Sequence, residues 1–386
     1  MIADSSPLVE RDVRVFPLFV IVLLSVSACD DVRSSPAADV PSTHALIDLV
    51  IGTVEGPDEY VFGRITGLAA DTVGNIYVSD VQASEIRMYD ADGAFKRRVA
   101  RSGSGPGEVQ SPCCLAVGLD GRLWVRDGGN GRYNWYAISS SGAIETGTIR
   151  MAHGDAWYSM APSFGSDGHL VDVGHRHEVD ASAIVRFHRD AVGDVFQEEL
   201  IRRPPRDSLA EHELTRETGV GAVTMVFHQP FGPFHLTAHS PRGGWAEAVS
   251  SRYSIRWHVS DSKPDVHIDR EWEGPEVTAA ERDAARNELE ESLRRIGASF
   301  GNLPFGVPER KAPLRALQFD QAGRLWVHLT QPNAEAPRAH VYDSAGILLA
   351  DIIWPERVSV VFLGDDMGLG IRSDSLGVNR VVRLRW

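Results

Sequence analysis

Short hydrophobic stretches of alternating pattern recur along most of the chain, separated by turns rich in Asp and Gly. Three of them are nearly the same string: Gly-Asn-Ile-Tyr-Val-Ser-Asp at 74–80, Gly-Arg-Leu-Trp-Val-Arg-Asp at 121–127 and Gly-Arg-Leu-Trp-Val-His at 323–328. β-Branched and aromatic residues bounded by such turns predict antiparallel strands joined by hairpins. The pattern therefore predicts a chain built mostly from short strands.

These strings are copies of a repeat with a nearly fixed period. Glycines that open a copy stand at positions 74, 121, 168, 244, 323 and 368, so the successive spacings are 47, 47, 76, 79 and 45 residues. Three spacings agree on one period, and the other two exceed it by about 30 residues each. A period of this size indicates a propeller or a solenoid, here with two insertions.

Each complete copy predicts a sheet of four strands. In the first copy the strands are expected at 65–70, 75–79, 85–89 and 94–100. Such a sheet is apolar on both faces, and a radial arrangement buries both against neighbouring copies. Six copies are expected, and their first residues lie near Ile65, Pro112, Met160, Pro233, Leu314 and Val360.

The last copy ends at Trp386 after its third strand, 380–386, and so lacks an outer strand. The segment 44–53 forms an orphan strand before the first copy. Pairing the two would close the ring and remove an exposed edge. The sequence thus predicts an all-β fold: a six-bladed β-propeller whose N-terminal strand closes the last blade, with a short helical insertion.

The string at 74–80, followed by Glu-Ile-Arg-Met-Tyr-Asp-Ala-Asp-Gly at 85–93, resembles an NHL-type repeat. Gly-Ser-Gly-Pro-Gly-Glu at 103–108, followed by Pro112, is similar to the linker between blades in six-bladed propeller lipoproteins of bacteria. The resemblance covers about 44–386 and is strongest over copies one, two and five. It implies the propeller fold, and it implies no single activity.

The two insertions, at about 202–229 and 273–313, are expected to lie on one rim of the propeller, because both join an outer strand to the next inner strand. The second insertion predicts a helix that begins with a capping box, Thr278-Ala-Ala-Glu281. Its apolar stripe is Ala285, Leu289, Leu293 and Ile296. Such a helix is either a lid or partner-docking element or a plug of the channel mouth.

The N-terminus is typical of a secretory signal. An apolar run of 12 residues, 15–26, follows Arg11 and Arg14 and is shorter than the roughly 20 residues that a membrane-spanning helix needs. The small residues before Cys29 resemble a bacterial lipobox, which implies cleavage before Cys29 and a lipid on that residue. An ordinary signal peptide is the alternative. We expect a signal peptide at 1–28, a flexible tether at 29–43 and the propeller at 44–386.

Charge limits the partners that the chain can have. The formal net charge is −14, and no run of Lys or Arg offsets it, which argues against nucleic acid as a partner. Contact with a membrane is expected only through the lipid on Cys29. The protein is therefore expected to be lipid-anchored in the bacterial cell envelope, outside the cytoplasm.

No catalytic residue, metal site or cofactor is predicted. The inner strands hold no carboxylate before their terminal turns, which disfavours a calcium site or an acid–base pair. His175 and His177 could form half of a zinc site, but surface histidines are the preferred interpretation without a third ligand. Asp80 and Asp127, at the ends of second strands, are expected to cap turns rather than contact a ligand.

Cys113 and Cys114 are the only cysteines beyond Cys29. Consecutive residues of a strand point to opposite faces, so a disulfide between them would be strained. Two small buried thiols are the preferred interpretation, and a vicinal redox pair is the alternative.

A ligand would bind at the rim of the channel under the insertions. The candidate residues there each precede or begin an inner strand: Arg64, Gln110, Tyr158, His228 and Arg315. Two arginines on an acidic body favour an anionic or carbohydrate ligand. We predict a membrane-anchored propeller that binds a small molecule, a glycan or a protein. The alternative is a metal-dependent lyase or hydrolase with its site in the channel.

Overall fold

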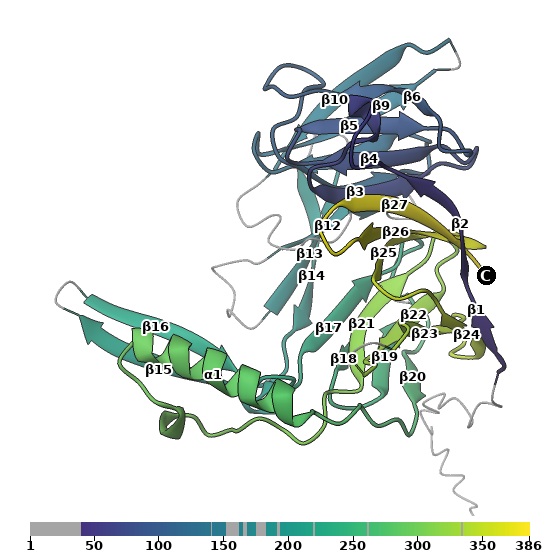
Figure 1. The fold of residues 1–386 in the computed structure, drawn as a ribbon. Helices are drawn as coiled ribbons and strands as arrows, with labels where there is room; N and C mark the ends of the chain where they lie inside the picture. Colours follow the sequence, from purple (N-terminus) through teal and green to yellow (C-terminus); the bar gives the residue numbers. More distant parts are fainter. Residues whose placement is uncertain are drawn as a thin grey trace, which may run out of the picture. The chain divides into compact units, whose positions relative to one another are not determined.

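A computed structural model describes residues 40–139, 141–151, 162–164, 168–174, 183–190, 194–218, 221–260, 262–332 and 335–386. Over these residues the chain forms six sheets of four or five strands, one separate hairpin and one α-helix (Figure 1). This confirms the predicted all-β class and the six-bladed propeller. Cys29, Met160, the predicted signal peptide and most of the predicted tether lie outside the described residues.

In each blade the strands follow one another in chain order and pair antiparallel. Blade one holds β3 (Ile65–Ala70), β4 (Ile76–Asp80), β5 (Glu85–Tyr89) and β6 (Phe95–Ala100). Blade two holds β7 (Pro112–Val117), β8 (Leu123–Asp127), β9 (Arg132–Ile138) and β10 (Ile144–Arg150). Blade three holds β11 (Ser163–Phe164), β12 (Leu170–Gly174), β13 (Ala183–Arg189) and β14 (Val195–Arg202).

The other three blades continue the same plan. Blade four holds β17 (His235–His239), β18 (Trp245–Val249), β19 (Ser254–His258) and β20 (Val266–Asp269). Blade five holds β21 (Leu314–Phe319), β22 (Leu325–Leu329), β23 (Arg338–Tyr342) and β24 (Leu348–Ile353). Blade six holds β25 (Val358–Leu363), β26 (Met367–Ser373) and β27 (Asn379–Arg385). A short 3-10 helix, η1 (Asp58–Tyr60), precedes blade one.

The N-terminal segment closes the ring as predicted. Strand β2 (Leu46–Ile51) pairs antiparallel with β27, from Leu46 opposite Arg385 to Ile51 opposite Val381. A second contact was not predicted: β1 (Ser42–His44) pairs in parallel with β24, and the Ser42 hydroxyl donates a hydrogen bond to Asp351 at 2.6 Å. The first strands of the chain therefore tie blade five to blade six.

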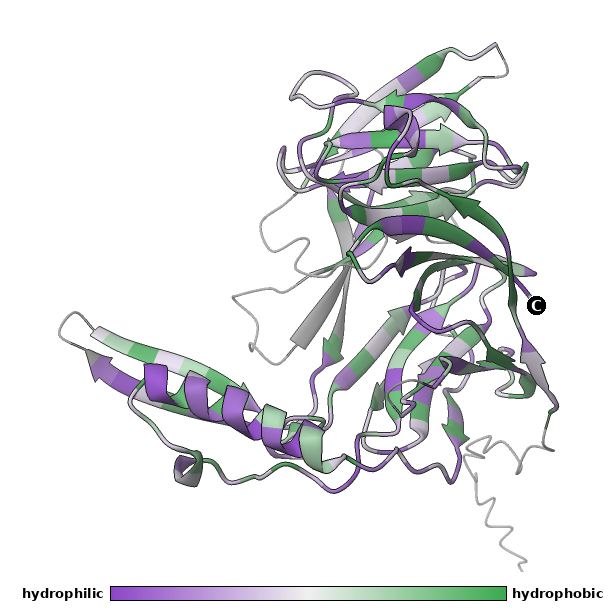
Figure 2. Ribbon diagram, viewed as in Figure 1, coloured by the Kyte–Doolittle hydropathy of each residue, from purple (hydrophilic) through white to green (hydrophobic). Residues whose placement is uncertain are grey.

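Apolar side chains from each blade pack against the next, so every one of the six interfaces between neighbouring blades has a hydrophobic cluster. One pair from each cluster, buried except for the partly buried Trp245, is Ile86 and Leu123 for blades one and two, Trp124 and Phe164 for two and three, Val173 and Trp245 for three and four, Trp257 and Phe319 for four and five, Trp326 and Val382 for five and six, and Val78 and Leu369 for six and one. Figure 2 shows hydrophobic residues along the blade strands. Fully burying one such side chain contributes about 1.5–3 kcal/mol.

The two insertions pack against each other. The first forms η2 (Arg206–Leu209) and a hairpin of β15 (Glu211–Thr218) and β16 (Gly221–His228), which the sequence analysis did not foresee. The second forms α1 (Ala279–Arg295) and η3 (Phe300–Asn302). As predicted, Thr278 and Glu281 form a capping box at the start of α1.

The apolar stripe of α1 contacts the hairpin. Leu289 and Leu293 are buried, and with Ile296 they pack against Phe227, Leu214 and Met225. Figure 1 shows α1 lying along β15 and β16, and Figure 2 shows that the rest of its surface is mainly hydrophilic. This contact already uses the stripe, so a partner could not dock on the helix through it without separating helix and hairpin. The expectation of a lid or a plug stays a prediction.

Candidate functional site

Asp80 and Asp127 hold the chain where it enters an inner strand. The carboxylate of Asp80 accepts hydrogen bonds from the backbone N–H groups of Gly63 at 2.8 Å and Arg64 at 3.0 Å. That of Asp127 accepts them from Gln110 at 3.0 Å and Ser111 at 2.9 Å. Both side chains are fully buried. The Asp80 carboxylate also accepts from the N–H of Gln82 at 3.1 Å in the turn after β4, and that of Asp127 accepts from the Asn130 side chain at 2.6 Å in the turn after β8. The prediction that both residues cap turns is therefore confirmed.

Of the predicted ligand-binding residues that the structure describes, one lines a large cavity. Arg64 is exposed, and the Gln110 amide donates to Ser104 Oγ at 3.0 Å. His228 belongs to the hairpin rather than to the rim: its Nδ1 lies 3.1 Å from a carboxylate oxygen of Glu211. None of the three lines the cavity described below, and Tyr158 lies outside the described residues. Arg315 lines the cavity.

This cavity has a volume of about 680 Å³ and lies between blades five and six. Its walls are the first residues of the inner strands β21 and β25, the end of β22, and the segments that follow β22 and β24. The lining residues are Lys311, Arg315, Ala316, Gln318, His328, Leu329, Thr330, Gln331, Pro332, Glu335, Pro337, Arg338, Trp354, Glu356, Arg357, Val358, Ser359 and Val360. Lys311 in this wall belongs to the second insertion, and Arg315 and Val358 lie at the starts of inner strands.

Two of the four basic side chains in the wall already have ion-pair partners. Lys311 Nζ lies 2.6 Å from a carboxylate oxygen of Glu281, and Arg338 Nε donates to Asp351 at 2.8 Å. The guanidinium groups of Arg315 and Arg357 are exposed, and neither has a hydrogen-bond or ion-pair partner within the described part of the chain. These two cations are available to a ligand.

Both arginines stand at irregular points of the backbone. Arg315 stands at a β-bulge, where the register shifts between Leu314 and Ala316, and bulges re-aim side chains next to binding sites. Arg357 has φ +62°, a left-handed conformation that costs about 1–2 kcal/mol for a residue with a side chain. Strained residues of this kind cluster at ligand-binding sites.

The remaining wall mixes polar side chains with apolar ones, which are Ala316, Leu329, Pro332, Pro337, Trp354, Val358 and Val360. Glu335 and Glu356 are exposed in the same wall, so they offset the charges of the two free arginines. Gln318 donates to the carbonyl of Val361 at 3.1 Å, and Thr330, Gln331 and Ser359 add further hydroxyl and amide groups; the ring of Trp354 completes the set. The wall thus suits one anionic group and several hydroxyls better than a polyanion.

His328 is a residue of this wall that the sequence analysis did not single out. Burial and, to a smaller extent, the positive charge of Arg315 together lower its pKa to about 4. Its Nε2 is buried without a hydrogen-bond partner in the described structure, and its ring meets Trp354 edge to face at 5.5 Å. It is therefore a neutral imidazole at pH 7. The repeat could have indicated this residue, because His328 in copy five stands at the position that Arg126 holds in copy two.

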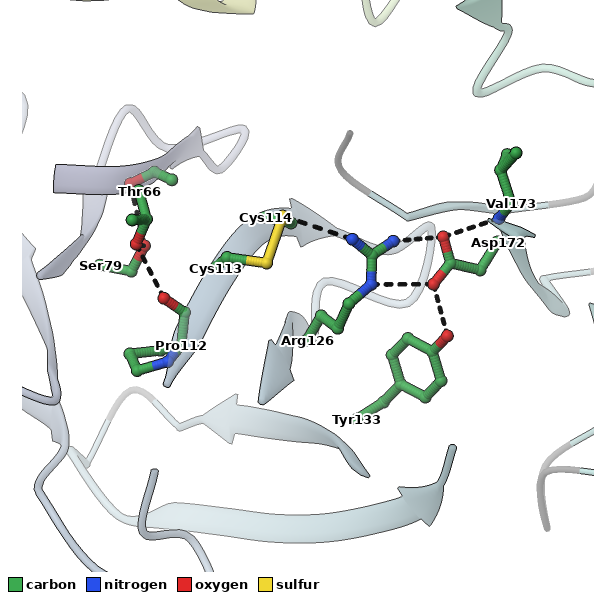
Figure 3. Close-up of a disulfide and its surroundings, with 10 residues drawn as sticks. Thr66, Ser79, Pro112, Cys113, Cys114, Arg126, Tyr133, Asp172 and Val173 are labelled. Atoms are coloured by element: carbon green, nitrogen blue, oxygen red, sulfur yellow. Dashed lines mark hydrogen bonds and ion pairs between the residues drawn. A yellow bond between two sulfur atoms is a disulfide. The ribbon is translucent and has the colours of Figure 1, made fainter. Parts of the chain in front are cut away.

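Cys113 and Cys114 form a disulfide, so the preferred interpretation of two free thiols is wrong (Figure 3). The reason is a bulge: the register shifts between Cys113 and Ala116, and Cys114 has φ +62°. The two side chains therefore do not alternate as they would in a regular strand.

A buried ion pair lies beside this disulfide. Arg126 of β8 donates to Asp172 of β12 through Nε at 3.0 Å and also through Nη2, and its Nη1 lies 3.4 Å from Cys114 Sγ. The Tyr133 hydroxyl donates to the same carboxylate (Figure 3). Burial alone would lower the pKa of Arg126, but the charges of and hydrogen bonds with Asp172 and Tyr133 together outweigh burial and raise that pKa. The pair links blades two and three.

The described residues hold no group of three or more His, Cys, Asp or Glu side chains placed to bind a metal ion. His175 and His177 lie outside those residues, and His235 pairs with Glu247 at 2.9 Å. The alternative of a metal-dependent lyase or hydrolase stays a prediction. In the same part of the chain, α1 is too short and too polar to cross a bilayer, and no other helix qualifies.

No protein-family model matches the sequence, and no curated protein is similar to it. Solved structures are similar at low identity. A candidate exported protein from Bacteroides fragilis is 11% identical, with 92% of this chain and 99% of that chain covered and a TM-score of 0.49. Virginiamycin B lyase from Staphylococcus aureus is 14% identical, with 83% and 94% covered and a TM-score of 0.39. Regucalcin from Agrobacterium tumefaciens is 11% identical, with 89% and 97% covered and a TM-score of 0.39. The fold assignment therefore rests on the sheet topology of this chain.

Proposed function

We propose that the protein is a binding module for a small ligand that carries one anionic group and several hydroxyls, as an acidic carbohydrate does. The ligand is held in the cavity between blades five and six. The same proposal places the propeller outside the cytoplasm, attached to a membrane by a lipid on Cys29. The signal-like run at 15–26 and the lipobox-like residues before Cys29 support that location.

The observation that carries the proposal is the free guanidinium of Arg315. A planar guanidinium binds a carboxylate with two parallel hydrogen bonds, and a hydrogen bond to a charged group contributes about 1.5–3 kcal/mol. Arg315 reaches the cavity from the bulged start of β21, and Arg357 lies in the same wall on the segment between β24 and β25. The two arginines can therefore act on one anionic group or on its neighbours.

The hydroxyl groups of a sugar would use the other donors and acceptors of the wall. Thr330, Gln331 and Ser359 supply groups that both donate and accept. The apolar residues of the wall, with the largely buried Trp354 among them, can face the apolar side of a sugar ring. Glu335 and Glu356 would repel a second anionic group, and they can accept hydrogen bonds from hydroxyls. These features support a monoanionic sugar over a polyphosphate.

The test is a binding screen on the chain from residue 40 onward. Hexuronates and their oligomers are compared with the matched neutral hexoses by isothermal titration calorimetry. We expect acidic sugars to bind, and Arg315→Ala to weaken the binding by about 10- to 150-fold, the equivalent of the charge-assisted hydrogen bond. Arg64→Ala is the matched control, because Arg64 is an exposed arginine directly before β3 of blade one and lies outside the cavity wall.

Two results would contradict the proposal. One is binding of a neutral and an acidic sugar with equal affinity, which would leave the guanidinium without a role. The other is an equal loss of binding in Arg64→Ala and Arg315→Ala, which would place the ligand elsewhere. For the anchor, labelling cells with a fatty-acid analogue should mark the wild-type protein and not Cys29→Ser.

A further inference from the structure

The disulfide between Cys113 and Cys114 contributes little to holding the fold together. A disulfide stabilises chiefly by restricting the unfolded chain, and the effect grows with the length of the loop that it closes. Here the two cysteines are adjacent, so the loop is the shortest that a chain can form. The hydrophobic clusters of blade two already fix strand β7. The stability of the fold therefore does not account for this bond.

The backbone around the two cysteines is strained. Cys114 adopts φ +62°, a region in which a Cβ atom is crowded, and the bulge at Cys113 interrupts the pairing of β7 with β8. The peptide N–H of Cys114 also lies so close to Gly67 that a Cβ there would come within 2.9 Å. Conformations of this kind occur where a reactive group must be held in place.

The two sulfurs have different surroundings. Cys113 is partly exposed, whereas Cys114 is only 3% exposed. Arg126 Nη1 donates to Cys114 Sγ at 3.4 Å, and Asp172 holds the guanidinium in place through two other nitrogens (Figure 3). A fixed cation beside a sulfur stabilises its thiolate and makes that sulfur the better leaving group. Cys113 is therefore the sulfur that an external thiolate can attack, and Cys114 is the sulfur that leaves.

We propose that Cys113–Cys114 is a redox-active disulfide that accepts two electrons from a dithiol. A thiolate of the dithiol attacks Cys113 Sγ, the Cys113–Cys114 bond breaks, and Cys114 departs as a thiolate beside Arg126. The second thiol of the donor, once deprotonated, attacks its own sulfur in the mixed disulfide and releases Cys113. The donor leaves as a disulfide, and the two cysteines end as thiols after taking up two protons. In this step Arg126 is a positioning residue.

The experiment uses the full chain. The native protein is incubated with dithiothreitol, alkylated with iodoacetamide and mapped by mass spectrometry, which separates the peptide of Cys113 and Cys114 from that of Cys29. We expect both cysteines of the pair to become alkylated under conditions in which circular dichroism stays native. Resistance of the native pair, together with full alkylation after unfolding, would overturn the proposal and leave a structural bond.

Single-cysteine variants test the assigned roles. In Cys114→Ala only Cys113 of the pair remains, and in Cys113→Ala only Cys114 remains. Cys113 should attack a monothiol disulfide probe at least about tenfold faster than Cys114 does, because the exchange rate follows access to the sulfur. In Cys113→Ala, the pH profile of alkylation should report a thiol pKa below the ordinary value, and Arg126→Lys should keep part of that effect because it keeps the charge. Equal rates in the two single variants, or an ordinary thiol pKa in Cys113→Ala, would overturn the assignment.

Discussion

The ion pair between Arg126 and Asp172 allows a quantitative test of how blades two and three are joined. Both side chains are only 2% exposed. Arg126→Met removes the charge but keeps much of the volume, and it leaves the carboxylate buried with only the Tyr133 hydroxyl and the Val173 N–H, 2.8 Å away, as donors. Breaking a buried pair in this way costs about 3–5 kcal/mol. That is a large part of the roughly 5–15 kcal/mol that holds a typical domain folded.

Urea denaturation gives the free energy of unfolding for a double-mutant cycle of Arg126→Met, Asp172→Leu and both together. The double variant should recover most of the loss, because an apolar pair of similar volume is nearly neutral in place of a buried ion pair. The control is Arg295→Met, since the pair of Arg295 with Glu291 is 72% and 60% exposed and should contribute little to stability. A loss below about 1 kcal/mol in Arg126→Met, or strictly additive losses in the cycle, would refute the reasoning.

Three further predictions concern stability. The pKa of His328 is about 4 in the folded protein and about 6.5 in the unfolded chain, so the unfolded chain binds more protons between these values. The free energy of unfolding should therefore fall by about 3 kcal/mol as the pH drops from 6.5 to 4. His328→Phe should make this fall smaller in denaturation curves measured across the same pH range. An unchanged fall would contradict the low pKa of His328. Thr278→Ala removes the N-cap of α1 and should cost about 1 kcal/mol by the same measurement, whereas no loss would mean that the cap is dispensable. Gly244 has φ +79°, and a Cβ there would lie 2.3 Å from the His258 carbonyl oxygen. At Gly121 φ is similar but the space is open, so Gly121→Ala should cost ~1 kcal/mol of stability. Gly244→Ala should cost clearly more. Equal melting temperatures for the two alanine variants would contradict this comparison.

The propeller could be predicted because its signal is repeated. Copies of one string at a near-constant spacing predict the blades, and a missing last strand together with an orphan first strand predicts the closure that β2 and β27 form. The hairpin of β15 and β16 was missed because β15 carries a single large apolar residue, Leu214, and its apolar contact comes from α1 in the other insertion. A pattern read along one segment does not show a core that two distant segments share.

The site was predictable only in part for a similar reason. Arg315 followed from its place at the start of an inner strand, but Arg64, directly before the inner strand of blade one, lines no part of the cavity. What distinguishes them is the wall built by the segments after β22 and β24, and no repeat specifies those segments. The disulfide was missed because the side chains of Cys113 and Cys114 were assigned by the period of a regular strand, and a bulge changes that period by one residue.

The claim on which the blade order and the rim depend is that the N-terminal strands complete the ring. The most direct test compares the thermal unfolding of a chain that begins at residue 40 with one that begins at residue 53. The shorter chain lacks β1 and β2 and so exposes the edge of β27 and the apolar neighbours of Ala45 and Ile51, which are 3% and 2% exposed. We predict that its melting temperature falls by several degrees, because a loss of even 1 kcal/mol shifts the midpoint measurably. An unchanged melting temperature would contradict a propeller closed by its N-terminal strand.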